Sequence, residues 1–514
     1  MPQSEIIAQS RPRLIFWSFL IALCLVVVWG AWFGHFPLGV AGEWEWRRID
    51  FVGSLTATVA PPAICGLLYM GFVWLGTLRI ARSRAGEFAT WLCGLALFGF
   101  AWLWTAQESA PHTFQLSKAA WVLYFRGSSG YFSEAREGAG DLAAYLAAYE
   151  DKMGEGDVLH LGTHPPGLVI IFRALIGLCE SIPLLVDGLI ASEPESVAAS
   201  FDELAHVNLL ARTDRAVLWL ATLLVQAAAA LAVIPLYGLI RRDQSRRASW
   251  IAAAFWPAIP ALPIFLPKSD CLYPLLATGF MWLWLAGRDR ESRAISFLAG
   301  FLFWLGMMLS LALLPIAFFA ALAAPRLSRC LRLIAWAVAG FLVPALAVWV
   351  VLKLNMAAIW WMNFRNHAGF YGQYPRTMWK WLLVNPVEFA VAAGLPLAVL
   401  STWSIVRQLR SRDQKPARAT WAFLGTLGLL WVSGKNMGEA ARLWIILMPF
   451  LVWIAAPLFE SPSAMALDGR VPASGQSSAI ETSGLGRSAW MAVLALQLAT
   501  TTALVMRVVG FHYP

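Results

Sequence analysis

The stretch Leu161-Gly162-Thr163-His164-Pro165-Pro166-Gly167-Leu168 decides how the rest of the chain is arranged, because a polar loop ends there and an apolar segment begins. Two prolines give a stiff extended entry, and proline is tolerated in the first turn of a helix. Segment 165–190 is interrupted by Arg173, Glu180 and Asp187. A charge at the bilayer centre is costly, so we expect 165–190 to lie in the membrane interface without crossing it.

The composition around this stretch is that of a membrane protein. Of 514 residues, 59% are hydrophobic and 13% are charged, with a mean hydropathy of +0.63, whereas soluble domains carry about 25% charged residues. The 28 tryptophans suit anchoring at both membrane interfaces. The net charge of +9 comes largely from arginine clusters between apolar segments. We therefore expect cytoplasmic basic loops and no nucleic-acid partner.

The apolar segments predict an all-α polytopic membrane protein with about 13 transmembrane helices. They lie near 14–33, 55–78, 88–106, 214–239, 248–266, 271–287, 294–309, 310–324, 333–352, 386–406, 418–433, 441–459 and 489–508. With the N-terminus in the cytoplasm, every arginine cluster falls inside. Loops 34–54, 107–213, 267–270, 353–385 and 434–440 then fall outside, in a cell inner membrane.

This topology divides the chain into three N-terminal helices (1–106), an outer loop with interfacial helices (107–213), a bundle with an outer aromatic loop (214–459), a flexible cytoplasmic linker (460–488) and a last helix (489–514). The six cysteines are scattered through apolar runs without paired spacing. They are typical of small buried hydrophobic residues rather than of disulfides or a zinc site.

Polar residues in the outer loops are the candidates for chemistry. Glu134 follows Gly130-Tyr131-Phe132-Ser133, and His164 stands at the start of the interfacial helix, where backbone N–H groups favour a phosphate. Arg212 begins the next span, where it binds either lipid headgroups in general or a specific lipid phosphate. Lys268 and Asp270 share a tight turn. Either the two side chains pair with each other at the interface, or Lys268 binds a phosphate and Asp270 contacts sugar hydroxyls.

Two later outer segments add to this set. The aromatic segment 353–385 contains Arg365, His367 and Tyr371, which suit stacking on sugar rings and binding phosphate, although an aromatic belt has a similar composition. Glu439 and Arg442 are three residues apart, on one helical face, either as a plain ion pair or as a donor-phosphate site.

In this order the motifs resemble the GT-C superfamily of membrane glycosyltransferases, and within it the protein O-mannosyltransferases and aminoarabinose transferases. The residues that carry the resemblance are Tyr131-Phe132-Ser133-Glu134, Thr163-His164-Pro165-Pro166-Gly167, Arg212 and Gly438-Glu439-Ala440-Ala441-Arg442-Leu443-Trp444. In this chain the acidic loop follows the third span instead of the first, and the acidic motif is Ser-Glu instead of Asp-Glu.

The resemblance implies transfer of a sugar from a polyprenyl-phosphate donor to an acceptor at the outer face, by a single inverting displacement. Glu134 is then the expected general base, with Glu43, Glu45 and Asp50 of the first outer loop as competitors. The phosphate and substrate ligands are His164, Arg212, Lys268, Asp270, Arg365, His367, Tyr371, Glu439 and Arg442. We expect no cofactor; some relatives are helped by a divalent metal, but no ligand spacing here demands one. The acceptor is a glycan, a lipid or a protein.

Two other classes fit the same composition. A transporter or flippase for a lipid-linked glycan would share the basic outer sites, but it more often places charges in the middle of spans. A structural membrane scaffold has no need of five polar loops on one face.

Overall fold

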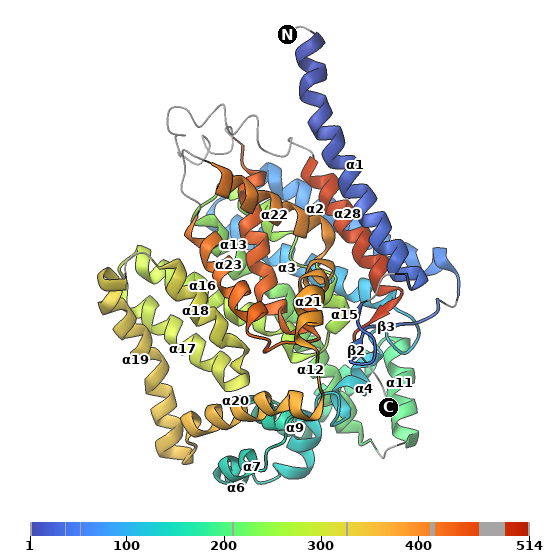
Figure 1. The fold of residues 1–514 in the computed structure, drawn as a ribbon. Helices are drawn as coiled ribbons and strands as arrows, with labels where there is room; N and C mark the ends of the chain where they lie inside the picture. Colours follow the sequence, from blue (N-terminus) through green and yellow to red (C-terminus); the bar gives the residue numbers. More distant parts are fainter. Residues whose placement is uncertain are drawn as a thin grey trace.

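The computed structural model describes residues 3–35, 38–51, 53–207, 210–324, 327–411, 417–461 and 489–511 (Figure 1). The described chain is built from helices, with two short two-stranded ribbons as its sheet structure. The expected all-α class is therefore confirmed.

Six helical segments are long and apolar enough to cross a membrane. They are α1 (Gln3–Phe33, apolar from Ile15), α2 (Leu55–Arg79), α3 (Ala85–Glu108), α12 with α13 (Arg212–Leu231 and Val233–Arg241), α19 (Leu327–Leu352) and the run of α24, η4, α25 and η5 (Ala440–Leu443, Ile445–Leu447, Met448–Ala455 and Ala456–Phe459). Two bent helix pairs raise the count to eight at most. The expectation of about 13 spans is thus not confirmed for the described residues.

Most of the other predicted spans are helices too short to qualify. They are α16 (Tyr273–Asp289), α17 (Arg293–Leu309), α18 (Leu314–Ala323, after η3 at Leu311–Leu313), α23 (Arg418–Val432) and α28 (Ala489–Val505). A 17-residue helix such as α16 rises about 26 Å, slightly less than the hydrocarbon core of roughly 30 Å. Helices α16, α17, α23 and α28 are 15 to 17 residues long, at or just below the roughly 17 residues that a span needs, whereas α18 has 10 residues and is shorter by about two turns.

Two predicted spans are broken by proline and glycine. Segment 248–266 forms α14 (Arg246–Ala253) and α15 (Ala261–Phe265), separated by a stretch that contains Pro257 and Pro260. Segment 386–406 bends by 111° at Gly394, between α21 (Met378–Ala393) and α22 (Leu395–Arg410). Gly394 has φ +88°, and a Cβ there would lie 1.9 Å from the amide nitrogen of Gln497. Only glycine fits this bend.

The long loop 107–213 folds into short helices at one end of the bundle. They are α4 (Lys118–Tyr124), α5 (Tyr131–Ser133), η1 (Glu134–Gly138), α6 (Leu142–Ala147), α7 (Tyr149–Gly154), α8 (His160–Thr163), α9 (Gly167–Ser181), α10 (Pro183–Ala191) and α11 (Glu195–Val207). The α9–α10 pair bends by 102°, which is consistent with the expected interfacial course of 165–190. Helix α20 (Met356–Gln373) contacts α7 and α8 and lies with α6, α7 and α9 at the lower end in Figure 1.

Gly167 fixes where α9 begins. A Cβ on this residue would lie 2.3 Å from the carbonyl oxygen of Met308, so the start of α9 packs directly on the end of α17. The glycine of the His-Pro-Pro-Gly stretch is therefore required by close packing. It brings His164 beside the bundle.

The two strand ribbons connect the first loop to the last helix. Strand β1 (Gly39–Val40) pairs antiparallel with β2 (Trp44–Glu45), and β3 (Arg47–Arg48) pairs antiparallel with β4 (Val508–Val509). Arg507 donates to the carbonyls of Trp32 and Ile49, and the Trp32 indole donates to Ala503 O at 2.9 Å. Segments near both termini are thus held together.

Four of the six cysteines are buried, as expected, whereas Cys65 is half-buried and Cys93 is exposed. None of the six is in a disulfide.

Candidate functional site

Lys268 is the centre of a polar cluster at the end of the bundle that carries loop 107–213. It lies between α15 and η2 (Ser269–Cys271) and is 4% exposed. Its ammonium donates to the carbonyl of Ser128 and approaches His160 Nε2 at 3.2 Å. Burial, and then the nearby Arg442 guanidinium, lower the pKa of Lys268 to about 7. A buried ammonium beside a second cation favours an anion.

Two histidines of the long loop stand against this lysine as neutral rings. His160 hydrogen-bonds with the backbone of Gly127, which leaves Nε2 to accept from Lys268. The Nδ1 of His164 lies 3.0 Å from His160 O, so we assign the proton to Nδ1 and leave Nε2 as an acceptor. Burial lowers the pKa of His160 well below its usual value and that of His164 to about 3. Both rings therefore act as hydrogen-bond partners at neutral pH.

Arg442 approaches the same point from α24. Its Nη2 donates to Glu439 at 2.7 Å, and its Nε lies 3.9 Å from Asp270 Oδ2. The guanidinium is 11% exposed, and its Nε is buried without a hydrogen-bond acceptor among the described residues. Such an orphan donor is costly unless a ligand supplies an acceptor.

Hydroxyl groups surround the charges. Tyr131 and Tyr273 are both buried, and the Tyr273 hydroxyl donates to Ser269 Oγ at 3.2 Å. The Tyr131 and His164 rings are 5.8 Å apart. Burial, together with the nearby Tyr273 and Asp270, raises the pKa of Tyr131 well above its usual value, so this phenol stays protonated as a donor.

The segment that carries Glu439 and Arg442 is held in a fixed shape by its neighbours. We call residues 433–439 the strap. Glu439 has φ +55°, a conformation that a non-glycine residue keeps only under constraint. The Tyr371 hydroxyl donates to Lys435 O at 2.8 Å and accepts from Met437 N at 2.7 Å, and Asn385 donates to Asn436 O at 2.9 Å. Tyr371 therefore supports the site from outside.

Helix α20 fastens the strap and the histidine segment to each other. Asn363 donates to Gly162 O at 2.9 Å, and Asn366 donates to the same oxygen at 3.0 Å. His367 is half-buried on the same side, and burial and Lys435 lower its pKa. Arg365 is exposed and lies on nearly the opposite side of α20 from Asn363, about 160° around the helix. The predicted role of Arg365 in this site is not supported by its position.

Glu134 stands apart from the cations of the cluster. Its carboxylate is 2% exposed and pairs with Lys152, and it lies against Gly138 in the same helical turn. Tyr149 lies between the two regions, because its hydroxyl donates to His164 O at 2.9 Å and it is near enough to Glu134 for the two groups to interact electrostatically. A carboxylate held by its own lysine would have to break that pair before it could act as a base.

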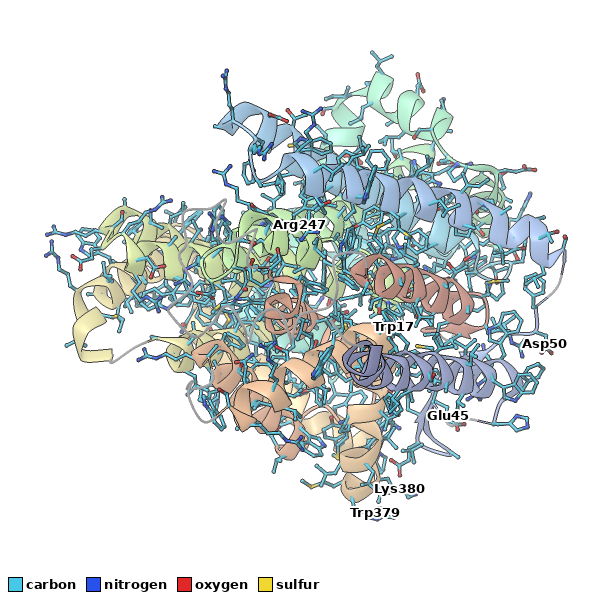
Figure 2. All side chains as sticks on the ribbon, turned by 90° about the horizontal axis from the view of Figure 1, so that it is seen from above. Trp17, Glu45, Asp50, Arg247, Trp379 and Lys380 are labelled. Carbon is cyan, nitrogen blue, oxygen red and sulfur yellow. The ribbon has the colours of Figure 1, made fainter. Side chains whose placement is uncertain are left out.

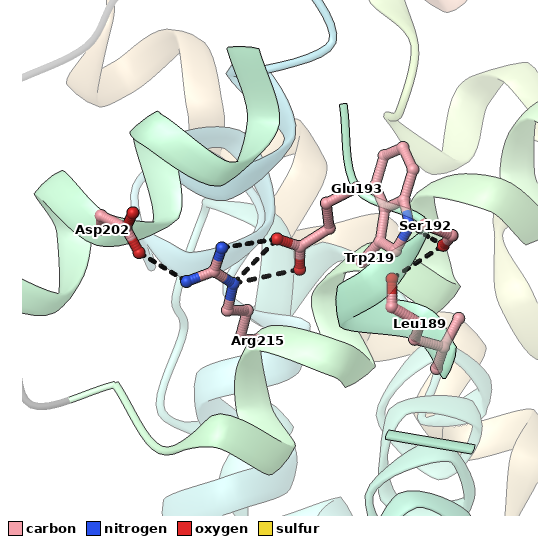
Figure 3. Close-up of polar contacts among 6 residues, drawn as sticks. All are labelled: Leu189, Ser192, Glu193, Asp202, Arg215 and Trp219. Atoms are coloured by element: carbon pink, nitrogen blue, oxygen red, sulfur yellow. Dashed lines mark hydrogen bonds and ion pairs between the residues drawn. The ribbon is translucent and has the colours of Figure 1, made fainter. Parts of the chain in front are cut away.

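Arg212 also lies elsewhere, on the surface, where it pairs with Asp187. Its neighbour Arg215 is the structural arginine of this helix end (Figure 3). Arg215 donates to both oxygens of Glu193, which is 1% exposed, and to Asp202 at 2.5 Å. Arg215 thereby fixes the α10–α11 segment to α12, whereas Arg212, the predicted phosphate ligand, is exposed and outside the Lys268 cluster.

The first loop docks on α21 through Glu43. Its carboxylate accepts from Thr377 N at 2.9 Å and from the Trp381 indole at 2.7 Å. Burial opposes ionisation, but these hydrogen bonds and Lys380 outweigh it and lower the pKa of Glu43 to about 2. Glu45 and Asp50 are exposed and lie at the margin of the molecule (Figure 2).

The structure thus brings together His164, Lys268, Asp270, Glu439 and Arg442, with His367 and Tyr371 around them, and leaves out Glu134, Arg212 and Arg365. Sequence reasoning did not name Tyr131, His160 or the Ser128 carbonyl as site groups, although Tyr131 stands in the motif that ends at Glu134. In the described part of the chain, no group of three His, Cys, Asp or Glu side chains is arranged to hold a metal ion. Compared with models of protein families and with curated proteins, the chain matches none of them.

Proposed function

We propose that this chain is a membrane glycosyltransferase that takes a sugar from a polyprenyl-phosphate donor and passes it to an acceptor at the outer face. The observation that carries the proposal is the pairing of Lys268 with Arg442. Lys268 has a carbonyl and an imidazole as its hydrogen-bond partners, and Arg442 has an orphan Nε. Two buried cations repel each other, and their unused N–H donors can bind the oxygens of a phosphodiester.

The geometry suits a leaving lipid phosphate. An ammonium has three N–H donors, of which Lys268 uses two in the resting structure. The third N–H of Lys268 and the Nε of Arg442 are free to bind phosphate oxygens. Fixed cations in a buried site stabilise the negative charge that develops on the departing phosphate.

For the general base we favour Asp270 over Glu134. Asp270 lies in the same turn as Lys268 and faces Arg442 at 3.9 Å, with its side chain 16% exposed. It is thus beside the cations and still accessible. A single displacement needs one carboxylate to take the proton of the acceptor, and the leaving phosphate needs the two cations. Glu134 remains the base implied by the family resemblance.

The alternative is a transporter or flippase for a lipid-linked glycan. Buried charge within the bundle would favour it, and Glu388 on α21 is 1% exposed. Glu388 lies near the backbone of Ala440 and Ala441 at the start of α24, and both of its carboxyl oxygens are buried without a hydrogen-bond partner among the described residues. Glu388 is a single buried carboxyl group beside the segment that carries Arg442, whereas a transport pathway usually places several ionisable groups along the spans.

The experiment is mass spectrometry of the lipids that co-purify with the full chain in detergent. We compare the wild type, a Lys268→Ala Arg442→Ala double variant, and Arg212→Ala as a matched control for loss of a cation outside the cluster. The expected result is a polyprenyl phosphate bearing a single sugar in the wild type and control, and its loss from the double variant. Bulk phospholipid alone in all three samples, or a pyrophosphate-linked oligosaccharide, would contradict the proposal.

A second comparison separates the two bases. In a transfer assay with the identified donor, Asp270→Asn should lower turnover by about a hundredfold or more, the usual contribution of general-base catalysis. Glu134→Gln should reduce it less and mainly through stability. The reverse order would return the role to Glu134.

A further inference from the structure

Lys118 is a second buried lysine, and the cluster around Lys268 does not include it. It begins α4 in the long loop 107–213 and is 2% exposed. Its ammonium donates to Pro263 O at 2.5 Å and to Ile264 O at 3.5 Å. Burial lowers the pKa of Lys118 to about 7. Because the burial of an ammonium costs free energy, a lysine in this place calls for a specific role.

The two carbonyl groups that Lys118 binds lie where the hydrogen-bond ladder of α15 ends. In a continuing helix, the N–H four residues later would bond to Pro263 O, but that position is a proline and has no N–H. Ile264 O would accept from Lys268 N, which bonds instead to Phe265 O at 2.8 Å. A buried carbonyl group without a donor is costly. Lys118 therefore supplies a donor where the backbone ladder stops, just before Lys268.

Lys118 and Lys268 connect the same two segments in opposite directions. From segment 118–128, Lys118 donates to two carbonyl groups of segment 263–268. From segment 263–268, Lys268 donates to Ser128 O. The partners in these contacts are 145 and 140 positions apart in the sequence. Two reciprocal contacts therefore fix the turn that carries Lys268 against the long loop.

We propose that Lys118 is a positioning residue for the phosphate site, an inference that rests on the proposed function. When Lys268 turns its ammonium donors toward a lipid phosphate, its own contact with Ser128 O is shared with the ligand. The contact from Lys118 then keeps the two segments together. Lys118 acts through the backbone that carries Lys268 and Asp270, and it does not bind the phosphate itself.

A lysine that only stabilised the bundle would behave differently. Its loss would lower the amount of folded protein and leave the affinity of each folded molecule for phosphate unchanged. The bonds of Lys118, however, lie four and five residues before Lys268. A shift of about 1 Å in a group that binds substrate can lower activity by about a hundredfold. We therefore expect a change in affinity beyond any change in stability.

The test is binding of farnesyl phosphate, a short polyprenyl phosphate, to the monodisperse full chain in detergent. Lys118→Met keeps the shape of the side chain without its donors, and the affinity should fall about tenfold or more. The control is Gln226→Leu, which removes two buried hydrogen bonds between α12 and α3. It should lower the unfolding temperature and leave the affinity unchanged.

The outcomes separate this inference from the proposed function. Wild-type affinity in Lys118→Met, or an equal loss of affinity in Gln226→Leu, would overturn the role of Lys118 alone. A wild type that does not bind farnesyl phosphate would overturn the proposed function and this inference together.

Hydrogen–deuterium exchange of the wild type tests the same point without a substitution. Peptides that cover 264–272 should be protected before farnesyl phosphate is added, because Lys118 already holds this turn. In Lys118→Met the same peptides should exchange faster. Exchange in the wild type as fast as that of the exposed segment 154–157 would overturn the proposal.

Discussion

The free energy of unfolding of Lys268→Met, compared with that of the wild type, should be higher at acidic pH than at basic pH. The pKa of Lys268 falls from 10.5 to about 7 in the folded protein. Each pKa unit corresponds to about 1.4 kcal/mol, so the buried charge costs roughly 5 kcal/mol compared with an exposed lysine. Methionine has a similar shape and removes this cost, although it leaves Ser128 O and His160 Nε2 without their donor.

The pH dependence isolates the charge from the lost hydrogen bonds. For a lysine whose pKa is lowered on folding, the cost is complete below the folded pKa and disappears as the pH rises from about 7 to 10.5. The free energy of unfolding of Lys268→Met, minus that of the wild type, should therefore decrease by roughly 2 to 3 kcal/mol between about pH 6 and pH 9. The loss of hydrogen bonds shifts this difference by a constant amount.

Denaturant unfolding in detergent at three pH values measures the difference. Lys353→Met serves as the matched control, because Lys353 is exposed and should give no such slope. Ligand-binding residues are often retained at the expense of stability, so the same variant should lose the co-purifying lipid. A flat difference across this pH range, or an equal slope in the control, would refute the account of Lys268 as a buried cation that awaits an anion.

Three further results are expected. Arg215→Ala leaves Glu193 buried without its cation and should lower the free energy of unfolding by about 3 to 5 kcal/mol, whereas Arg212→Ala should change it by less than about 1 kcal/mol; equal effects would contradict the ion-pair geometry. Tyr371→Phe removes two hydrogen bonds to the strap and should cost about 1 to 3 kcal/mol and lower transfer; an unchanged unfolding curve would argue against that support. Glu43, whose pKa is lowered on folding, contributes stability at neutral pH that is lost as the pH falls from about 4.5 towards 2; acid titration of the unfolding temperature should show this loss in the wild type and not in Glu43→Gln.

Local patterns in the sequence predicted local features of the site. The spacing of Glu439 and Arg442 predicted a pair, and the two form an ion pair at 2.7 Å, although Glu439 precedes helix α24 with φ +55° and so does not share a helical face with Arg442. Lys268 and Asp270 were expected together because they share one turn. What brings Lys268 to Arg442, Ser128 and His160 is packing between elements far apart in the chain, and no spacing rule reports such contacts.

Two of the predicted spans are broken in the structure, and the sequence partly contained the reasons. Gly394-Leu395-Pro396 combines a residue that allows φ +88° with a proline that begins the next helix, so the bend at this point had a signal. Pro257 and Pro260 gave a similar signal in 248–266. A prediction from apolar composition alone treats both segments as straight transmembrane helices. Arg212 and Arg215 illustrate a different limit, since which of two nearby arginines is buried depends on tertiary contacts with Glu193.

The contacts between Arg507, Trp32 and Ile49 also set a time order for folding. The Arg507 guanidinium bonds to Trp32 O at 2.7 Å across 475 positions of sequence, and β3 pairs with β4 across a comparable separation. During synthesis, the first loop leaves the ribosome long before its partner strand exists. Contacts between residues so far apart in the sequence are expected to form late. The loop that carries Glu43 therefore lacks its contacts with Arg507 and β4 until the last helix is inserted. A chain stalled before that point would not form them.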